Sequence, residues 1–249
     1  MNLLRNQSVK TYAITLVCVL TGVLLRMAYC IKYPVQPRDS FVYESVIAHW
    51  EESGRIVDRV TYFPLSLWIL KIPHHFFHYD IIKGGIVVNV LLGILLIIFA
   101  TSIANYFFKN DFVSLIAGLA VATHPSLIGF SCTLLRENAY LVFTTLTAYV
   151  FLRYCQRICL LKLLLAGSLG ALAFLCRLEG VEILLNIYIG IFFLLIFKRV
   201  SLPVSIWHCL LVSLVFVITV LFVCYCMDFD AVSVYRAISK NQLGIVDLT

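Results

Sequence analysis

Long stretches without a charged residue dominate the pattern of this chain. These mostly apolar runs cover residues 11–25, 84–108, 112–135, 138–152, 163–176, 183–197 and 200–227. A helix that crosses a bilayer needs about 20 mostly apolar residues. Three of the runs reach that length alone, and the others reach it with flanking residues or local bilayer thinning; 138–152 and 163–176 are the weakest candidates. The pattern predicts about seven transmembrane helices, near residues 12–31, 84–107, 112–130, 138–152, 161–176, 181–197 and 204–227.

Composition agrees with this class. The chain is 62% hydrophobic and 13% charged, whereas soluble domains carry about 25% charged residues. No internal repeat or low-complexity linker divides it, so residues 1–249 are expected to form a single all-α polytopic membrane module. No small-x-small cleavage site follows the first run, and Arg26 interrupts its end, which favours an uncleaved first helix. The nine cysteines form no Cys-x-x-Cys pair and are expected to be buried structural thiols.

Charge predicts the orientation. With the N-terminus in the cytoplasm, the inner segments contain one acid, Asp111, and the basic residues Arg5, Lys10, Lys109, Arg153, Arg157, Lys162, Lys198 and Arg199. Short basic loops on the cytoplasmic side match the positive-inside rule. The net charge of +6 therefore indicates membrane topology and not nucleic-acid binding. The long loop 32–83 and the tail 228–249 then lie outside the cell (inner) membrane.

Two interfacial helices are predicted in the first outer loop. The apolar residues Tyr43, Val46, Ile47 and Trp50 share one face of a helix, which should rest on the membrane with Gly54 as its stop signal. A second segment should begin at Pro64, run over 65–72 and break at Pro73.

Asp39 begins the first of these segments, where it can cap the helix or act as a catalytic carboxylate. Ser40 can cap equally well, so spacing leaves both roles open. Further along, the histidines His74, His75 and His78 lie near Asp80. They could ligate a metal, but the aromatic residues interleaved with them favour an interfacial aromatic belt.

Charged residues near the ends of the spans are functional candidates, because charge is costly in a membrane. Arg26 can snorkel to the interface or face a cavity that holds an anionic ligand. Arg177 can bind a phosphate through its fork of donors, or it can pair with Glu179 or Glu137. Arg136 and Glu137 are adjacent and can neutralise each other. The His124–Pro125 pair should kink the third span.

Four segments, in order, carry a resemblance to a known family. They are LLRMAY followed by Asp39, Tyr43, Ala48 and Gly54; then TYFPLSLWIL; then ATHPSLIGFSCTLLRENAYLVF; and last LAGSLGALAFLCRLEGVEILL. Together they resemble the GT-C superfamily of polytopic glycosyltransferases, in the branch related to protein O-mannosyltransferases and lipid A aminoarabinose transferases. The resemblance covers nearly the whole chain. Two features depart from that branch: Asp39 is followed by Ser40 where many relatives have a second acid, and the chain stops soon after its last span, as a minimal or truncated member would.

The resemblance implies a polyprenyl-phosphate sugar as donor, membrane lipid as surroundings, a lipid, glycan or protein as acceptor, and catalysis at the outer face. Asp39 would be the general base, and Arg177, helped by Arg26 or Arg136, would bind the donor phosphate. Glu137 and Glu179 would form a second acidic site. No cofactor is required, since the leaving group is a phosphate, although a divalent metal is compatible with the reaction. The alternative is a non-catalytic protein that binds or transports polyprenyl-linked glycans or serves as a subunit.

These roles predict a geometry. Asp39, Glu137 and Arg177 should meet in one outward-opening pocket, with Asp39 on the rim and Arg177 in the wall. The helix over residues 43–50 should border this pocket.

Overall fold

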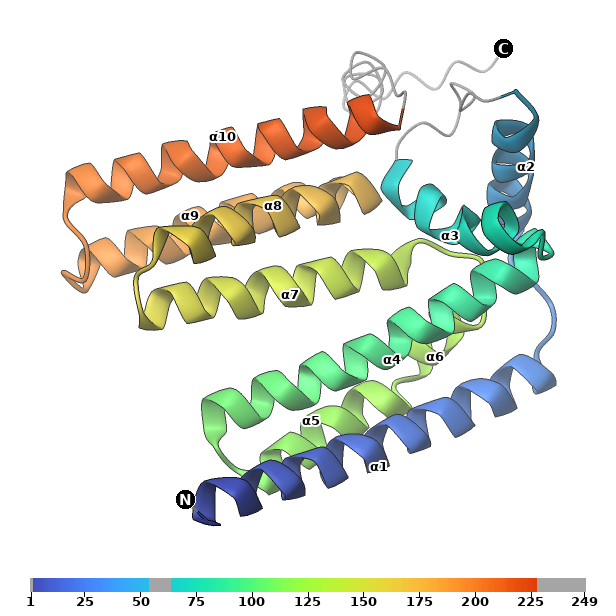
Figure 1. Ribbon diagram of the computed structural model, residues 1–249, viewed down its shortest axis with the longest axis horizontal. Helices are drawn as coiled ribbons and strands as arrows, with labels where there is room; N and C mark the ends of the chain where they lie inside the picture. The colour runs from blue at the N-terminus through green and yellow to red at the C-terminus, as the bar shows by residue number, and fades with distance from the viewer. Residues whose placement is uncertain (1, 54–63, 228–249) are drawn as a thin grey trace.

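Long antiparallel helices form the body of the molecule, and two shorter helices lie at one end of it (Figure 1). The computed structural model describes residues 2–53 and 64–227. The long elements are α1 (Asn2–Lys32), α4 (Ile81–Phe108), α5 (Asp111–Thr123) with α6 (Pro125–Ser131), α7 (Glu137–Gln156), α8 (Leu160–Cys176), α9 (Val181–Ile196) and α10 (Leu202–Cys226). The shorter elements are α2 (Arg38–Ser53), α3 (Pro64–Phe77) and the 3₁₀ turn η2 (Leu178–Gly180). The predicted all-α class is confirmed for these residues.

By length and composition, the described residues contain fewer candidate membrane spans than the sequence predicts. Four helical segments are long and apolar enough to cross a bilayer, and the bent pair α5–α6 makes a fifth; the four are Lys10–Lys32, Ile81–Phe108, Leu178–Ile196 and Leu202–Cys226. The predicted spans over 138–152 and 161–176 are not among them. At a rise of 1.5 Å per residue, the 17 residues of α8 extend only about 26 Å, short of a hydrocarbon core about 30 Å thick. Threonines and Asn138 make α7 less apolar than its neighbours. The described chain is thus an all-α membrane protein with four to five candidate spans.

The bend between α5 and α6 falls at His124, as predicted, and amounts to 56°. Pro125 has no N–H to continue the hydrogen bonding of α5, and it suits the first position of a new helix. The bend leaves carbonyl groups at the end of α5 without their usual helical partners.

The apolar face of α2 contacts protein. Its stripe from Tyr43 to Trp50 is buried against Leu67 and Leu70 of α3 and against Leu134. The prediction that this face rests on the membrane is therefore wrong, because α3 covers it. The predicted stop at Gly54 lies outside the described residues, as does the predicted outer tail 228–249.

The predicted break at Pro73 is also wrong, since α3 continues to Phe77. A proline inside a helix removes one hydrogen bond. Here the Pro73 ring packs where Gly84 of α4 has no side chain: a Cβ at Gly84 would lie 2.9 Å from Pro73 Cβ. This contact favours a helix that continues beyond the proline. The helix ends at Phe77, and the next residue, His78, has a positive φ of 50°.

Two packing groups make up the bundle (Figure 1). One joins α1, α4 and α5 around Cys18, Ile97 and Ala122. The other joins α7 to α10 around buried residues such as Tyr154 and Ile187. All nine cysteines are free thiols; four of them are buried within the protein, and Cys226 is exposed. The connections 132–136 and 177–180 lie at the same end of the bundle as α2 and α3, so the candidate site is gathered there.

Gly180 permits the close turn after α8. A Cβ at this position would collide with the backbone of Ala173 and Phe174. We expect Gly180→Ala to destabilise the fold by about 1–3 kcal/mol, since overpacking against backbone cannot be relieved by a rotamer change. Thermal unfolding of the purified protein in detergent measures this.

Gly129→Ala is the matched control, because a Cβ there would meet only Tyr29 Oη, at 3.7 Å. Equal unfolding temperatures for the two variants would show that the turn after α8 is not as tight as described.

Candidate functional site

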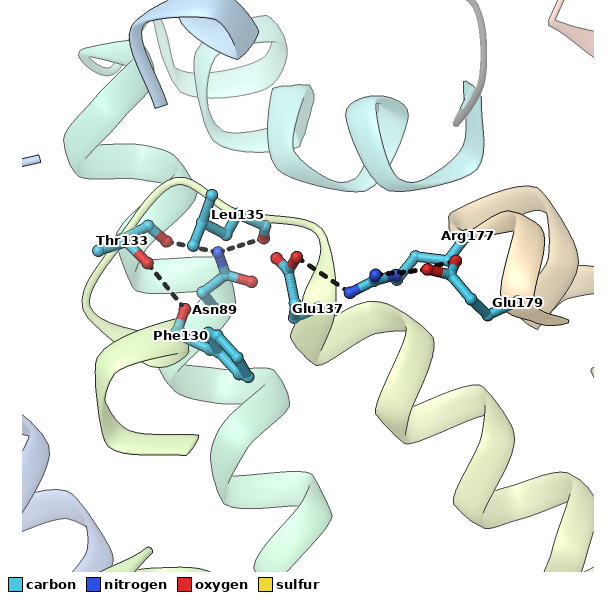
Figure 2. A network of polar contacts seen from close by, with 7 residues as sticks. All are labelled: Asn89, Phe130, Thr133, Leu135, Glu137, Arg177 and Glu179. Atoms are coloured by element: carbon cyan, nitrogen blue, oxygen red, sulfur yellow. Dashed lines mark hydrogen bonds and ion pairs between the residues drawn. The ribbon is translucent and has the colours of Figure 1, made fainter. Parts of the chain in front are cut away.

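Arg177 is the centre of the polar cluster at this end of the molecule (Figure 2). It follows the last residue of α8, while Glu137 is the first residue of α7 and Glu179 lies in η2. Arg177 Nη1 donates to Glu137 Oε1 at 3.1 Å. Nη2 and Nε donate to the two oxygens of Glu179 at 2.6 and 3.2 Å. Antiparallel packing of α7 and α8 therefore brings together residues that are far apart in the chain.

The cluster favours a permanently charged guanidinium. The hydrogen bond with Glu179, followed by the charges of Glu179 and Glu137, raises the pKa of Arg177 above its ordinary value. The Arg177 guanidinium also lies 5.8 Å from the ring centre of Tyr140. Glu137 uses only one oxygen in this cluster, since its Oε2 is buried without a hydrogen-bond partner. The site thus contains a fixed cation and a spare carboxylate oxygen.

Asp39 has no structural role as a helix cap. Because α2 begins at Arg38, Asp39 lies inside the first turn, and its side chain is exposed. Among the described residues it forms no hydrogen bond or ion pair. Ser40 is buried instead, and its Oγ donates to Leu134 O at 3.3 Å. Of the two roles that spacing allowed, capping by Asp39 is not observed, and its carboxylate is accessible.

Tyr43 connects Asp39 with the Arg177 cluster electrostatically. Burial raises the pKa of the Tyr43 phenol, while the charge of Arg136 and a hydrogen bond with it act in the opposite direction. The charges of Glu137 and Asp39 also act on this phenol. Tyr43 therefore lies within interaction range of all three. The sequence placed Tyr43 in the apolar stripe and among the residues of the family resemblance, but not in the polar site; its hydroxyl, one helical turn after Asp39, was the available signal.

Asn89 of α4 holds the loop that leads into α7 (Figure 2). Its Nδ2 donates to Thr133 O at 2.7 Å and to Leu135 O at 2.8 Å. Asn89 is fully buried. Both amide hydrogens are thereby used on the backbone just before Arg136 and Glu137. The sequence signal for this residue was an asparagine within an apolar span, which is costly unless it has a task.

Gln36 and Ser40 hold the same loop from the other side. Gln36 Nε2 donates to Cys132 O and its Oε1 accepts from Leu134 N, each at 3.2 Å. Together with the bond from Ser40 to Leu134 O, these contacts fasten the loop to the start of α2. The backbone near Glu137 is thus tied directly to the backbone near Asp39.

Arg26 lies apart from the Arg177 cluster, inside the bundle. It is 0% exposed, so it does not snorkel to the interface. Nε donates to Ser131 Oγ at 3.0 Å, and Nη1 donates to Gly22 O and Ala122 O at 3.1 and 3.3 Å. Ala122 lies near the end of α5, beside the bend, where backbone carbonyl groups lose their helical hydrogen-bond partners. Arg26 therefore stabilises the bend through Nε and Nη1, while its Nη2 is buried without a hydrogen-bond partner among the described residues.

The side chains of the histidine-rich segment contact separate groups and do not converge on one point. His74 Nδ1 lies 2.8 Å from Tyr79 O, and His75 Nδ1 lies 3.1 Å from Glu51 Oε1. Asp80 caps α4 by accepting from Lys83 N. In the described ranges, no group of three or more His, Cys, Asp or Glu side chains is placed to hold a metal ion.

Comparison with known proteins identifies the family. The family model described as dolichyl-phosphate-mannose-protein mannosyltransferase matches residues 62–224, more than half of the chain. The chain therefore belongs to this family, and so to the membrane glycosyltransferases of the GT-C type, as its sequence motifs indicated. It has no significant match among curated proteins or among solved structures.

The loop contacts make a prediction about Asn89. Replacing it with leucine leaves Leu135 O without its side-chain donor and leaves Thr133 O with only the N–H of Leu135. An unsatisfied buried group costs about 1–3 kcal/mol. We expect Asn89→Leu to lower the unfolding temperature and to increase amide hydrogen exchange over residues 132–137.

Thr101→Val is the matched control on the same helix. Thr101 is also fully buried, but its hydroxyl donates to Ile97 O within its own helix and does not contact the loop over residues 132–136. Exchange over 132–137 that is unchanged in Asn89→Leu, or equally increased in Thr101→Val, would contradict the role of Asn89.

Proposed function

We propose that this protein transfers a sugar from a polyprenyl-phosphate donor to a lipid, glycan or protein acceptor at the outer face of the cell membrane. Its family supports glycosyl transfer in a membrane. The observation that carries the residue assignment is the Arg177 cluster, which shares one end of the bundle with an exposed, unpaired Asp39. Tyr43 lies within electrostatic range of both Asp39 and Glu137.

Asp39 serves as the general base in this proposal. It accepts the proton of the acceptor hydroxyl as that oxygen attacks the anomeric carbon of the sugar. The bond from this carbon to the phosphate oxygen breaks, and its electron pair stays on the phosphate. A base must lie within hydrogen-bonding reach of the proton that it removes. The exposure of Asp39 and its lack of internal partners support this role.

Arg177 binds the leaving phosphate. Its fork of donors matches two phosphate oxygens as well as it matches a carboxylate. In the structure the fork is occupied by Glu179, and one further donor contacts Glu137. Phosphate would displace one carboxylate, and the extra negative charge of the leaving group would strengthen the contact as the bond breaks. Arg136, which directly precedes Glu137, is the second arginine that we assign to phosphate binding. Arg26 is not assigned to it, since its guanidinium bonds to Ser131 and Ala122 inside the bundle.

The phosphate leaving group needs no cofactor in this scheme. A divalent metal would assist only as an additional charge on the phosphate. Activity after removal of divalent ions by a chelator distinguishes the two forms of the reaction.

The proposal also includes the finer topology. We place all seven long elements across the membrane with the N-terminus in the cytoplasm, so that α7 and α8 cross within a locally thinned bilayer. The basic connections near Lys109, Arg157 and Lys198 share one end of the bundle, opposite to α2 and α3, and the positive-inside rule then directs that end to the cytoplasm.

A second candidate function is non-catalytic binding or transport of polyprenyl-linked glycans, alone or as a subunit. The observation in its favour is that Arg177 is already paired with two carboxylates. Such a cluster also suits a purely structural ion pair.

Asp39→Asn tests the catalytic assignment. We expect transfer by purified protein in donor-containing vesicles to fall by a factor of about 10²–10⁴, the usual contribution of a general base. The control is Asp80→Asn, which changes a structural cap at the same end of the molecule. Normal turnover by Asp39→Asn would remove Asp39 from the mechanism, and no transfer by the wild type would favour the second candidate.

A charge exchange tests the role of Arg177. In the double variant Arg177→Glu, Glu179→Arg, the pair between positions 177 and 179 can re-form with its sign reversed, although the pair with Glu137 is lost. The unfolding temperature should therefore be higher than that of Arg177→Glu alone. The guanidinium proposed to bind phosphate, however, is moved from position 177 to position 179. We expect at least about tenfold lower kcat/KM for the donor, in keeping with the loss of a charged contact to phosphate. Recovery of both stability and kcat/KM in this variant would assign Arg177 a structural role alone.

A further inference from the structure

A cavity of about 250 Å³ lies away from the Arg177 cluster, between α2, α3 and the end of α10. Aromatic side chains form much of its lining: Trp50, Trp68 and Phe76. Lys71 and His75 supply polar groups, and Met227 contributes from the end of α10. Binding sites for small ligands commonly combine such an apolar wall with a few fixed polar groups.

Trp68 is the unexplained member of this lining. Its side chain is 44% exposed in a cavity. Within the described parts of the chain it makes no hydrogen bond, ring stacking or cation–π contact. Trp50, by contrast, is buried, and Lys71 Nζ lies 4.2 Å from its ring centre. The cavity therefore presents one indole face that is available to a ligand.

The polar groups are held in place by Glu51. Glu51 Oε1 lies 3.1 Å from Lys71 Nζ and 3.1 Å from His75 Nδ1. Burial acts to raise the pKa of Glu51, but hydrogen bonds and charge from Lys71 and His75 outweigh it and leave that pKa below the ordinary value. Glu51 is therefore a carboxylate that offsets the charge of Lys71.

This charge balance decides between two kinds of ligand. Lys71 offers a single point charge that Glu51 offsets, and it lacks the bidentate fork of donors that Arg177 offers to phosphate. Lys71 retains further N–H donors, and the Nε2 of His75 is the ring nitrogen not used by Glu51. The ammonium donor of Lys71 and the free ring nitrogen of His75 lie beside an exposed aromatic face. This combination suits a neutral ligand that has both C–H and O–H groups on one ring, which is the chemistry of a sugar.

We propose that this cavity binds a neutral sugar unit of an oligosaccharide acceptor, with the C–H face of the sugar on Trp68 and its hydroxyls on Lys71 and His75. The assignment rests on the proposed function and narrows the acceptor class to a glycan. Asp39 and Trp50 are 11 positions apart on α2, or roughly 16 Å along the helix axis. A single sugar does not span this length, so the acceptor is an oligosaccharide that is anchored at the cavity and reacts near Asp39.

A remote anchor of this kind contributes binding energy far from the reacting bond. The inference is therefore testable by binding alone, without transfer.

The experiment uses the full chain in a detergent whose head group carries no sugar, because glycoside detergents would compete. Mannotetraose and maltotetraose are titrated separately, with saturation-transfer NMR as the readout. We expect saturable binding of at least one of them by the wild type and by Asp39→Asn. Trp68→Ala should raise its Kd about tenfold, the size of one lost aromatic contact with its buried area.

Trp207→Ala is the matched control. Trp207 is 59% exposed on α10, near the opposite end of that helix from the cavity, and its replacement should leave the Kd of the tetrasaccharide unchanged. Trp68→Phe retains a smaller ring and should have an intermediate Kd, which keeps the test valid if Trp68→Ala folds poorly. In an active preparation, Trp68→Phe should raise the KM for the glycan acceptor with little change in kcat.

Three results would overturn the inference. They are no saturable binding of either tetrasaccharide by the wild type, equal Kd values for the Trp68 and Trp207 variants, and competition by inorganic phosphate for the bound glycan. Binding that is retained by Asp39→Asn while Asp39→Asn and the wild type transfer equally well would leave the cavity assigned and would refute only the role of Asp39.

Discussion

The irregular backbone between α5 and α7 is the feature on which the site depends. Within a bilayer, backbone groups outside a helix must find partners in the protein. Four side chains supply such partners here. Arg26 donates to Ala122 O at the bend, and Asn89 donates to the carbonyls of Thr133 and Leu135. Gln36 bonds to Cys132 O and Leu134 N, and Ser40 donates to Leu134 O. Glu137 begins α7 directly after this loop. The position of the acidic group is thus set by polar residues buried below and beside it.

The same contacts tie the backbone near Asp39 to the backbone near Glu137. Gln36 lies just before α2 and Ser40 lies in its first turn, and both bind the loop that precedes Glu137. These hydrogen bonds therefore bring the segment next to Asp39 against the segment next to Glu137, although the two are far apart in sequence. Arg177 joins from the next helix pair through its ion pair with Glu137. A phosphate bound at Arg177 would consequently alter the ion pair with Glu137, whose second oxygen has no partner among the described residues.

Much of this fold is local in origin and could be predicted. The apolar runs marked each long helix, and the His124–Pro125 pair marked the bend. The seven-span count was less reliable, since α8 is short and α7 is comparatively polar. The errors in α2 and α3 share one cause. The apolar face of α2 was expected on lipid and α3 was expected to stop at Pro73, but contacts with Leu67, Leu134 and Gly84 decided both. An apolar stripe indicates burial and does not say whether lipid or protein covers it.

For the site, residue type and position along each span were enough to nominate Asp39, Glu137 and Arg177, because isolated charges at helix ends in an apolar chain are few and costly. Which of them touch could not be read from the chain. Arg177 could pair with Glu179 or Glu137, and the structure has it bind both. Arg26 was equally eligible, yet it is buried at the helix bend. Asn89 and Tyr43 acquired their polar partners only through helix packing. The hydrophobicity of each residue is a property of its own side chain, so the apolar runs can be recognised in the sequence. Hydrogen bonds between distant residues, by contrast, exist only once the helices are packed against one another.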